Sequence, residues 1–226
     1  MYIRLTQPKL LSSVPRITTN PALRRKHFPI AIIDNDPFLL TKELTYHGFD
    51  ITELGDIRDF PAVSEYPIVA CDIKDVGRHF GTKYEGAHVI AEIRKRYPDK
   101  FLIAYSAGMF SAEYTKYFDA CDVFLRRDVG FDQWRESLDK GIEIIGDPAI
   151  RWNRVRVLLL ESGMTTFDVF LIEDAYISSF KKKDPFILEK ALTRAASIRS
   201  TGEIVQSISH GLITVVKLAI KTAELF

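Results

Sequence analysis

The first two thirds of the chain carry short apolar runs, each of which ends abruptly in polar residues. These runs span residues 30–36, 67–72, 101–106 and 123–127. Their ends supply two acidic segments, a hydroxyl group and a pair of arginines. Short continuous apolar runs separated by helical patterns are typical of parallel strands that helices cover on both faces. We therefore predict an α/β fold with a five-stranded parallel sheet, in which residues 50–54 form the remaining strand.

The polar side chains at these strand ends form the candidate site. In an open parallel sheet, ligands bind in the crevice outside the carboxyl ends of the strands, where the strand order reverses. We therefore expect Asp34, Asp72, Ser106 and Arg127 to meet at one edge of the sheet.

Helical patterns alternate with the strands and then continue alone to the end of the chain. Asp36, Asp147 and Asp184 each precede a proline, which is the pattern of an N-cap followed by proline at the first helical position. Ser200 to Glu203 has the spacing of a capping box. The loops after Gly146 are short, so we expect an antiparallel bundle there. The predicted helices span residues 37–48, 86–97, 147–161, 166–180, 185–199 and 203–224.

The last predicted helix is apolar around nearly its whole circumference, from Ile204 to Ile220. A helix of this kind must be buried. It forms either the centre of the bundle or half of a dimer interface, and we favour the interface. This interpretation predicts a homodimer.

The charge distribution divides the chain into three predicted parts. Residues 1–28 form an arm with six basic residues and no acidic ones, residues 29–141 the α/β domain, and residues 142–226 a helical output or dimerisation domain. The helical part is close to neutral and has no helix-turn-helix spacing, so we do not expect it to bind nucleic acid. No secretory signal or bilayer-spanning stretch is visible, which favours a soluble cytoplasmic protein without membrane contact.

The order and spacing of the strand ends over residues 29–141 resemble the receiver domain of bacterial two-component response regulators, a flavodoxin-like fold. The resemblance implies that Asp72 is the phospho-accepting aspartate and that Ser106 contacts the phosphoryl group. It also implies that Phe124 is the switch aromatic and that Arg127 takes the place of the family's lysine.

The resemblance implies a Mg²⁺ site as well. Its expected ligands are Asp34, Asp36, Asp72 and the main-chain carbonyl of Lys74. Asn35 stands where the family has a second acid, which removes one negative charge and weakens the site for a hard cation. Restoring that acid with Asn35→Asp is therefore expected to tighten Mg²⁺ binding.

Three further departures from the family pattern affect the same site. Arg127 exchanges a compact ammonium for a planar fork. Asp128 replaces a proline whose peptide bond is cis in the family, and we expect a trans bond here. The loop between Asp72 and Gly86 is longer than in the family and is expected to lie over the acidic pocket.

Two functions follow from the resemblance. In the first, a histidine kinase or phosphotransfer protein phosphorylates Asp72, which controls protein association through the C-terminal helices. In the second, the domain is a pseudo-receiver, a protein-interaction module that acts without phosphorylation. Asp34, Asp72 and Ser106 favour the first function. Asn35, Arg127, Asp128 and the longer loop favour the second. A DNA-binding regulator is a weaker alternative, and the absence of known catalytic motifs leads us to expect no enzyme.

Overall fold

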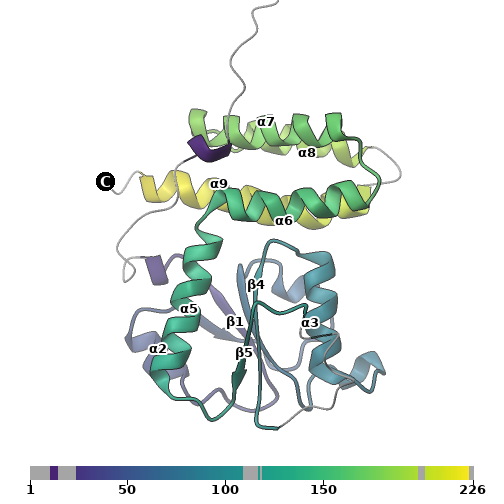
Figure 1. Ribbon diagram of the computed structural model, residues 1–226. Helices are drawn as coiled ribbons and strands as arrows, with labels where there is room; N and C mark the ends of the chain where they lie inside the picture. The colour runs from purple at the N-terminus through teal and green to yellow at the C-terminus, as the bar shows by residue number, and fades with distance from the viewer. Residues whose placement is uncertain (1–10, 15–23, 109–116, 118, 198–201, 224–226) are drawn as a thin grey trace, which may run out of the picture. The chain divides into compact units, whose positions relative to one another are not determined.

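The computed structural model describes residues 11–14, 24–108, 117, 119–197 and 202–223. These residues fall into two compact units, which Figure 1 traces. The α/β unit contains the described residues between Thr18 and Gly146. The helical unit contains those before Thr18 and those from Asp147 onward.

Within the described residues of the α/β unit, five strands form one parallel sheet. The strand order is β2-β1-β3-β4-β5, and each neighbouring pair is parallel. This is the flavodoxin-like doubly wound order, whose switch point lies between β1 and β3. The predicted α/β class and parallel sheet are confirmed, and the unit fits the receiver fold. The strands are β1 (Ile30–Ile33), β2 (Ile51–Glu53), β3 (Ile68–Asp72), β4 (Phe101–Ser106) and β5 (Val123–Arg126).

Helices bury the three inner strands on both faces. Every residue of β1, β3 and β4 is buried, as their continuous apolar runs require. α3 (Glu85–Arg96) packs on one face, where its apolar side chains meet Ala31 and Ile33 of β1. α2 (Thr41–Tyr46) and α5 (Phe131–Ile145) contact each other and the sheet on the other side (Figure 1).

Helix α2 begins later than the sequence suggests. It starts at Thr41, so the prediction of a helix from residue 37 with Asp36 as its N-cap is wrong. The N–H of Asp36 donates to Asp34 Oδ1 at 2.9 Å, and the N–H of Phe38 donates to Glu53 Oε2 at 3.0 Å. Side-chain acceptors therefore bind these N–H groups outside a helix.

The helical unit confirms the four predicted C-terminal helices. Asp147 accepts hydrogen bonds from the N–H groups of Ala149 and Ile150 at 2.9 and 3.2 Å, and Asp184 accepts one from Phe186 at 2.9 Å. The contacts of Asp147 match the expected cap. The predicted cap at Asp184 is wrong by one position, because α8 begins at Phe186 and Pro185 is its N-cap residue. Part of the capping box predicted at 200–203 lies outside the described residues. The helices are α6 (Pro148–Glu161), α7 (Thr166–Lys182), α8 (Phe186–Ala196) and α9 (Gly202–Ala223).

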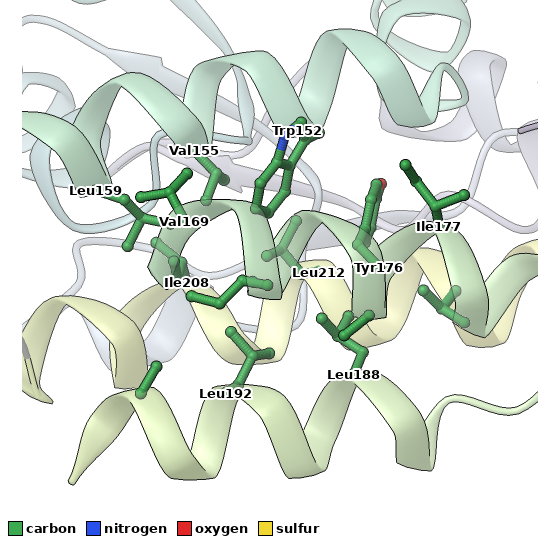
Figure 2. Packing of buried hydrophobic residues seen from close by; sticks show 14 of the residues in the cluster. Trp152, Val155, Leu159, Val169, Tyr176, Ile177, Leu188, Leu192, Ile208 and Leu212 are labelled. Carbon is green, nitrogen blue, oxygen red and sulfur yellow. The ribbon is translucent and has the colours of Figure 1, made fainter. Parts of the chain in front are cut away.

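The apolar face of α9 is buried within a single chain. Residues of α6, α7 and α8 surround it, including Trp152, Tyr176 and Leu188 (Figure 2). The interpretation that this helix forms half of a dimer interface is therefore wrong, and it lies in the core of the bundle. Homodimer formation itself stays a prediction. The fully buried residues of α9 are Val205, Ile208, Leu212, Val215 and Val216.

The amino-terminal residues take part in both units. Val14, which follows the 3₁₀ turn η1 (Leu11–Ser13), is buried in the helical core. Arg25, from the basic run, binds both carboxylate oxygens of Asp139 at 2.8 and 2.7 Å and lies over the ring of Phe49. At least one cation of that run is thus held by the protein's own acid. No helix in the described ranges is long and apolar enough to cross a membrane.

Val216→Glu is expected to unfold or strongly destabilise the helical unit, because it places a carboxylate in a fully buried position. An unpaired buried charge costs several kcal/mol. Denaturant unfolding followed by circular dichroism measures the loss, and Lys217→Glu, at the exposed neighbouring position, is the matched control. A folded variant of unchanged stability would contradict this packing.

Candidate functional site

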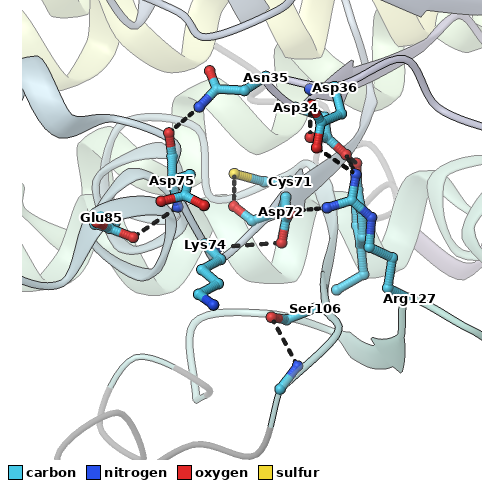
Figure 3. A network of polar contacts seen from close by, with 12 residues as sticks. Asp34, Asn35, Asp36, Cys71, Asp72, Lys74, Asp75, Glu85, Ser106 and Arg127 are labelled. Carbon is cyan, nitrogen blue, oxygen red and sulfur yellow. Dashed lines mark hydrogen bonds and ion pairs between the residues drawn. The ribbon is translucent and has the colours of Figure 1, made fainter.

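Polar side chains from four strands meet at the carboxyl edge of the sheet (Figure 3). Asp34 follows β1, Asp72 ends β3 and Ser106 ends β4. Arg127 follows β5, and its N–H donates to the carbonyl of Ser106 at 2.8 Å. This hydrogen bond extends the pairing of β4 with β5 by one residue. The register of the sheet therefore fixes the backbone position of Arg127.

The guanidinium of Arg127 lies among three carboxylates. Its Nη1 is 2.8 Å from Asp72 Oδ2, and its Nη2 is 3.0 Å from Asp34 Oδ2 and 3.4 Å from Asp36 Oδ2. The side chains of Asp34 and Asp72 are only 4% and 2% exposed, whereas that of Asp36 is 74% exposed. The two buried acids therefore hold the guanidinium most strongly, since solvent weakens the exposed pair.

Tyr105 is a member of the site that the sequence interpretation missed. Its hydroxyl donates to Asp34 Oδ2 at 2.8 Å, the same oxygen that Arg127 contacts. Burial and the charge of Asp34 raise the pKa of Tyr105 far above its ordinary value, so the hydroxyl stays a donor. Tyr105 lies inside the apolar run of β4, where a tyrosine is indistinguishable from a core aromatic. It also packs against Trp134 with ring centroids 5.2 Å apart.

Asp72 lies in a less favourable electrostatic position than a solvated acid. Burial is the largest cause that raises its pKa above the ordinary value of 3.8, and the charge of Asp34 acts in the same direction. The N–H of Lys74, which donates to Asp72 Oδ1 at 3.2 Å, and the charge of Arg127 lower it. The burial effect dominates, so Asp72 depends on its two donors.

The other predicted members of the site have separate contacts. Ser106 is buried, and its Oγ accepts the N–H of Gly108 at 3.5 Å. Phe124 is 39% exposed on β5. At Lys74, the contact with the site is through the main-chain N–H rather than the carbonyl that the resemblance implies. The phosphoryl-contact role of Ser106 and the switch role of Phe124 stay predictions.

Asn35 connects the site to the long loop that follows β3. Its Nδ2 donates to the main-chain carbonyl of Asp75. The N–H of Asp75 in turn donates to Glu85 Oε2 at 2.7 Å (Figure 3). Arg78 contacts the side chains of Asp75 and Glu85. A carboxylate at position 35 cannot donate, so the amide has a structural use that the family pattern did not suggest.

The far side of the same loop is held by further contacts. The N–H of Gly77 donates to Asp56 Oδ1 at 2.7 Å, and Phe80 stacks on Phe60 with ring centroids 4.9 Å apart. Gly86 closes the loop at the start of α3, where an added Cβ would lie 1.9 Å from the carbonyl oxygen of Asp72. Only glycine permits α3 to begin this close to the end of β3.

The donor set does not fit a bound Mg²⁺ in this arrangement. Mg²⁺ takes oxygen ligands in near-octahedral geometry, usually one or two carboxylates and several waters. Here Asp34 Oδ2 and Asp72 Oδ2 both bind Arg127, and the amide of Asn35 donates into the carbonyl of Asp75. Across the described ranges, no group of three or more His, Cys, Asp or Glu side chains is arranged to hold a metal ion.

Solved structures similar to this chain come from response regulators. A CheY-like response regulator receiver domain protein from Methanospirillum hungatei JF-1 is 20% identical, with a TM-score of 0.42, over 51% of this chain and 93% of that one. A Burkholderia pseudomallei response regulator, solved with a phosphorylated aspartic acid, calcium ion and citrate, is 13% identical, with a TM-score of 0.41, over 64% and 90%.

RcsB from Salmonella enterica serovar Typhimurium, solved on promoter rprA with BeF₃⁻, is 15% identical to this chain, with a TM-score of 0.40, over 78% of this chain and 97% of that one. No family model matches the sequence, and no curated protein matches it. At these identities the likeness concerns the fold alone.

Asn35→Asp is expected to destabilise the α/β unit by about 0.5–1.5 kcal/mol, because it replaces a donor to the exposed Asp75 carbonyl with a second acceptor. Hydrogen exchange is expected to rise in residues 75–85. Denaturant unfolding and exchange mass spectrometry measure the two effects. Asn153→Asp, on the exposed face of α6, controls for the added charge. Tighter Mg²⁺ binding with an unchanged loop would instead support the metal-site interpretation of position 35.

Arg127→Ala is expected to raise the pKa of Asp72 further, because the guanidinium is one of the groups that lower it. An acid whose folded pKa exceeds its unfolded value binds more protons when folded, so its contribution to stability falls as the pH rises from about 3.8 through the folded pKa. NMR titration of the Asp72 carboxyl carbon tests the shift. Arg126→Ala, which removes a cation paired with Asp128 instead, is the control. An unchanged pKa of Asp72 in Arg127→Ala would show that the guanidinium does not lower it.

Proposed function

We propose that the α/β unit is a pseudo-receiver, a response regulator-like signalling module in which Arg127 supplies the positive charge that a metal ion supplies in the receiver family. In this proposal the unit does not depend on phosphorylation of Asp72. Its output is protein association through the helical unit.

The contact between Arg127 and the two buried acids carries the proposal. A guanidinium presents several N–H donors in a fixed planar fork, so one side chain can bind carboxylates from two strands at once. The distances of 2.8 Å to Asp72 and 3.0 Å to Asp34 are those of charge-assisted hydrogen bonds. A lysine would present its three donors from one nitrogen, whereas the guanidinium reaches the two acids from two separate nitrogens.

The charge balance of the site supports the same proposal. Two buried carboxylates, Asp34 and Asp72, meet one guanidinium, and Asp36 adds a third acid that is largely in water. Removing one partner of a buried ion pair typically costs about 3–5 kcal/mol, because the other charge stays buried without compensation. A Mg²⁺ ion that enters this site must therefore displace Arg127 or bind beside it.

Phosphoryl acceptance at Asp72 is the competing function. Asp72 and Ser106 occupy the strand ends that the receiver pattern requires, which favours this function. Against it, the positive charge beside Asp72 already comes from Arg127, which binds Oδ2, while the N–H of Lys74 binds Oδ1. Each oxygen keeps a second lone pair, so a phosphodonor and its metal would compete with the guanidinium for the charge of the site.

The proposal predicts that the wild-type protein keeps its mass when incubated with Mg²⁺ and acetyl phosphate. Intact-mass spectrometry tests this directly. In titration calorimetry, Arg127→Ala is expected to bind Mg²⁺ more tightly than the wild type, because it frees Asp34 and Asp72 oxygens. Arg126→Ala is the matched control and is expected to behave as the wild type, since Arg126 pairs with Asp128 outside the site.

Labelling of the wild type by one phosphoryl group, lost in Asp72→Asn, would overturn the proposal and establish phosphoryl acceptance at Asp72. Equal labelling of the wild type and Asp72→Asn would exclude Asp72 as the acceptor. Mg²⁺ binding to the wild type as tight as to Arg127→Ala would show that the guanidinium does not substitute for the metal.

A further inference from the structure

The outer face of α7 and α8 carries large apolar side chains that the helical core does not use. Phe167, Phe170 and Leu171 of α7 are 67%, 55% and 47% exposed, and Phe186 of α8 is 64% exposed. The α7 residues follow i, i+3 and i+4 spacing, so they form one stripe. Contiguous exposed apolar surface of this kind marks an interaction site more often than scattered single residues do.

A groove of about 550 Å³ runs between the two helices beside this stripe. Leu171 and Ile172 line its α7 wall, and Phe186 and Ile187 line its α8 wall. The short α7–α8 connection makes the helices antiparallel, and the N–H of Leu188 donates to Ser179 Oγ at 3.0 Å near the turn. The groove therefore lies on a fixed helical hairpin.

Opposite charges line the two walls of the groove. The α7 wall carries Asp168, and the α8 wall carries Lys190 and Arg194, which are exposed. One carboxylate on one wall and two cations on the other make the surface self-complementary in charge, because a twofold contact sets each wall of one copy on the other wall of its partner.

We propose that this α7/α8 face binds a second copy of the chain. A twofold axis parallel to the helices lays α7 of each copy on α8 of the other, antiparallel, and brings Asp168 of one copy opposite Arg194 of its partner. Leu171 then enters the partner's groove near the small side chains of Ala191 and Ala195. The contact forms a four-helix arrangement and covers Leu171 and Phe186, the exposed apolar residues that line the groove.

The α7/α8 face is the surface through which the helical unit would associate, so this inference rests on the proposed function of that unit. It does not rest on the state of the acidic site. Oligomeric state and phosphodonor labelling are measured separately, so failure of one does not imply failure of the other.

Sedimentation equilibrium of the full-length wild type is expected to show a monomer–dimer equilibrium. Leu171→Asp is expected to weaken the dimer about tenfold or more, since it places a carboxylate in the apolar contact. Val157→Asp is the matched control, because Val157 is 55% exposed on α6, away from the groove, and its dimer is expected to be unchanged.

Charge reversal tests the orientation of the two copies. Arg194→Glu and Asp168→Arg are each expected to weaken the homodimer, because like charges then face each other across both contacts. A mixture of the two variants is expected to form a heterodimer, in which both contacts again join opposite charges. Asp168 also binds Thr165 at the start of α7, so circular dichroism checks that this variant is folded.

A wild type that is monomeric at every concentration would overturn the proposal. This holds even if an acidic amphipathic peptide binds the groove of that monomer. A dimer that resists both Leu171→Asp and Arg194→Glu would show that another surface forms the interface. If the single charge reversals weaken the dimer but their mixture does not restore it, the proposed orientation is wrong.

Discussion

The arrangement of the α/β unit depends on how two buried carboxylates are compensated. Asp34 and Asp72 end adjacent strands at the switch point of the sheet, and both are almost fully removed from water. Two acids in such a position repel each other and lose solvation. Arg127 offsets both effects at once because it follows β5 on the same edge of the sheet, and its fork reaches both acids.

The same constraint explains the shape of the surrounding loops. The Asp34 carboxylate accepts hydrogen bonds from Arg127, from the Tyr105 hydroxyl and from the N–H of Asp36. The hydrogen bond from Asp36 holds the chain outside a helix, and α2 begins only at Thr41. Asn35, next in the sequence, ties the loop after β3 to the site through the Asp75 carbonyl. The two loops on either side of the switch point are therefore held by one connected set of polar contacts.

Sequence patterns predicted the strands, the sheet and the C-terminal helices because each has a local cause: continuous apolar runs for buried strands, and a cap such as Asp147 before Pro148 for a helix start. The same pattern at Asp36 did not mark a helix start, because side chains from the site and from β2 bind the N–H groups there. The contacts inside the site have no such local signal. Tyr105 lies in an apolar run, where its sequence position resembles that of a core residue. The amide of Asn35 has a hydrogen-bond acceptor only because the fold places the Asp75 carbonyl next to it. The circumferential apolar pattern of α9 predicted burial correctly, but a pattern cannot say whether the covering residues come from the same chain or from a partner.

A cation that is part of the chain behaves differently from one that binds from solution. A metal ion can leave while the backbone stays in place, whereas Arg127 can leave the carboxylates only if its own side chain or the segment after β5 moves. Its N–H is bonded to the carbonyl of Ser106, so the backbone at this point belongs to the β4–β5 pairing. Movement is then confined to the side chain and to the residues that precede α5. A change that displaces Arg127 from the two acids is therefore expected to move its side chain or the segment between β5 and α5.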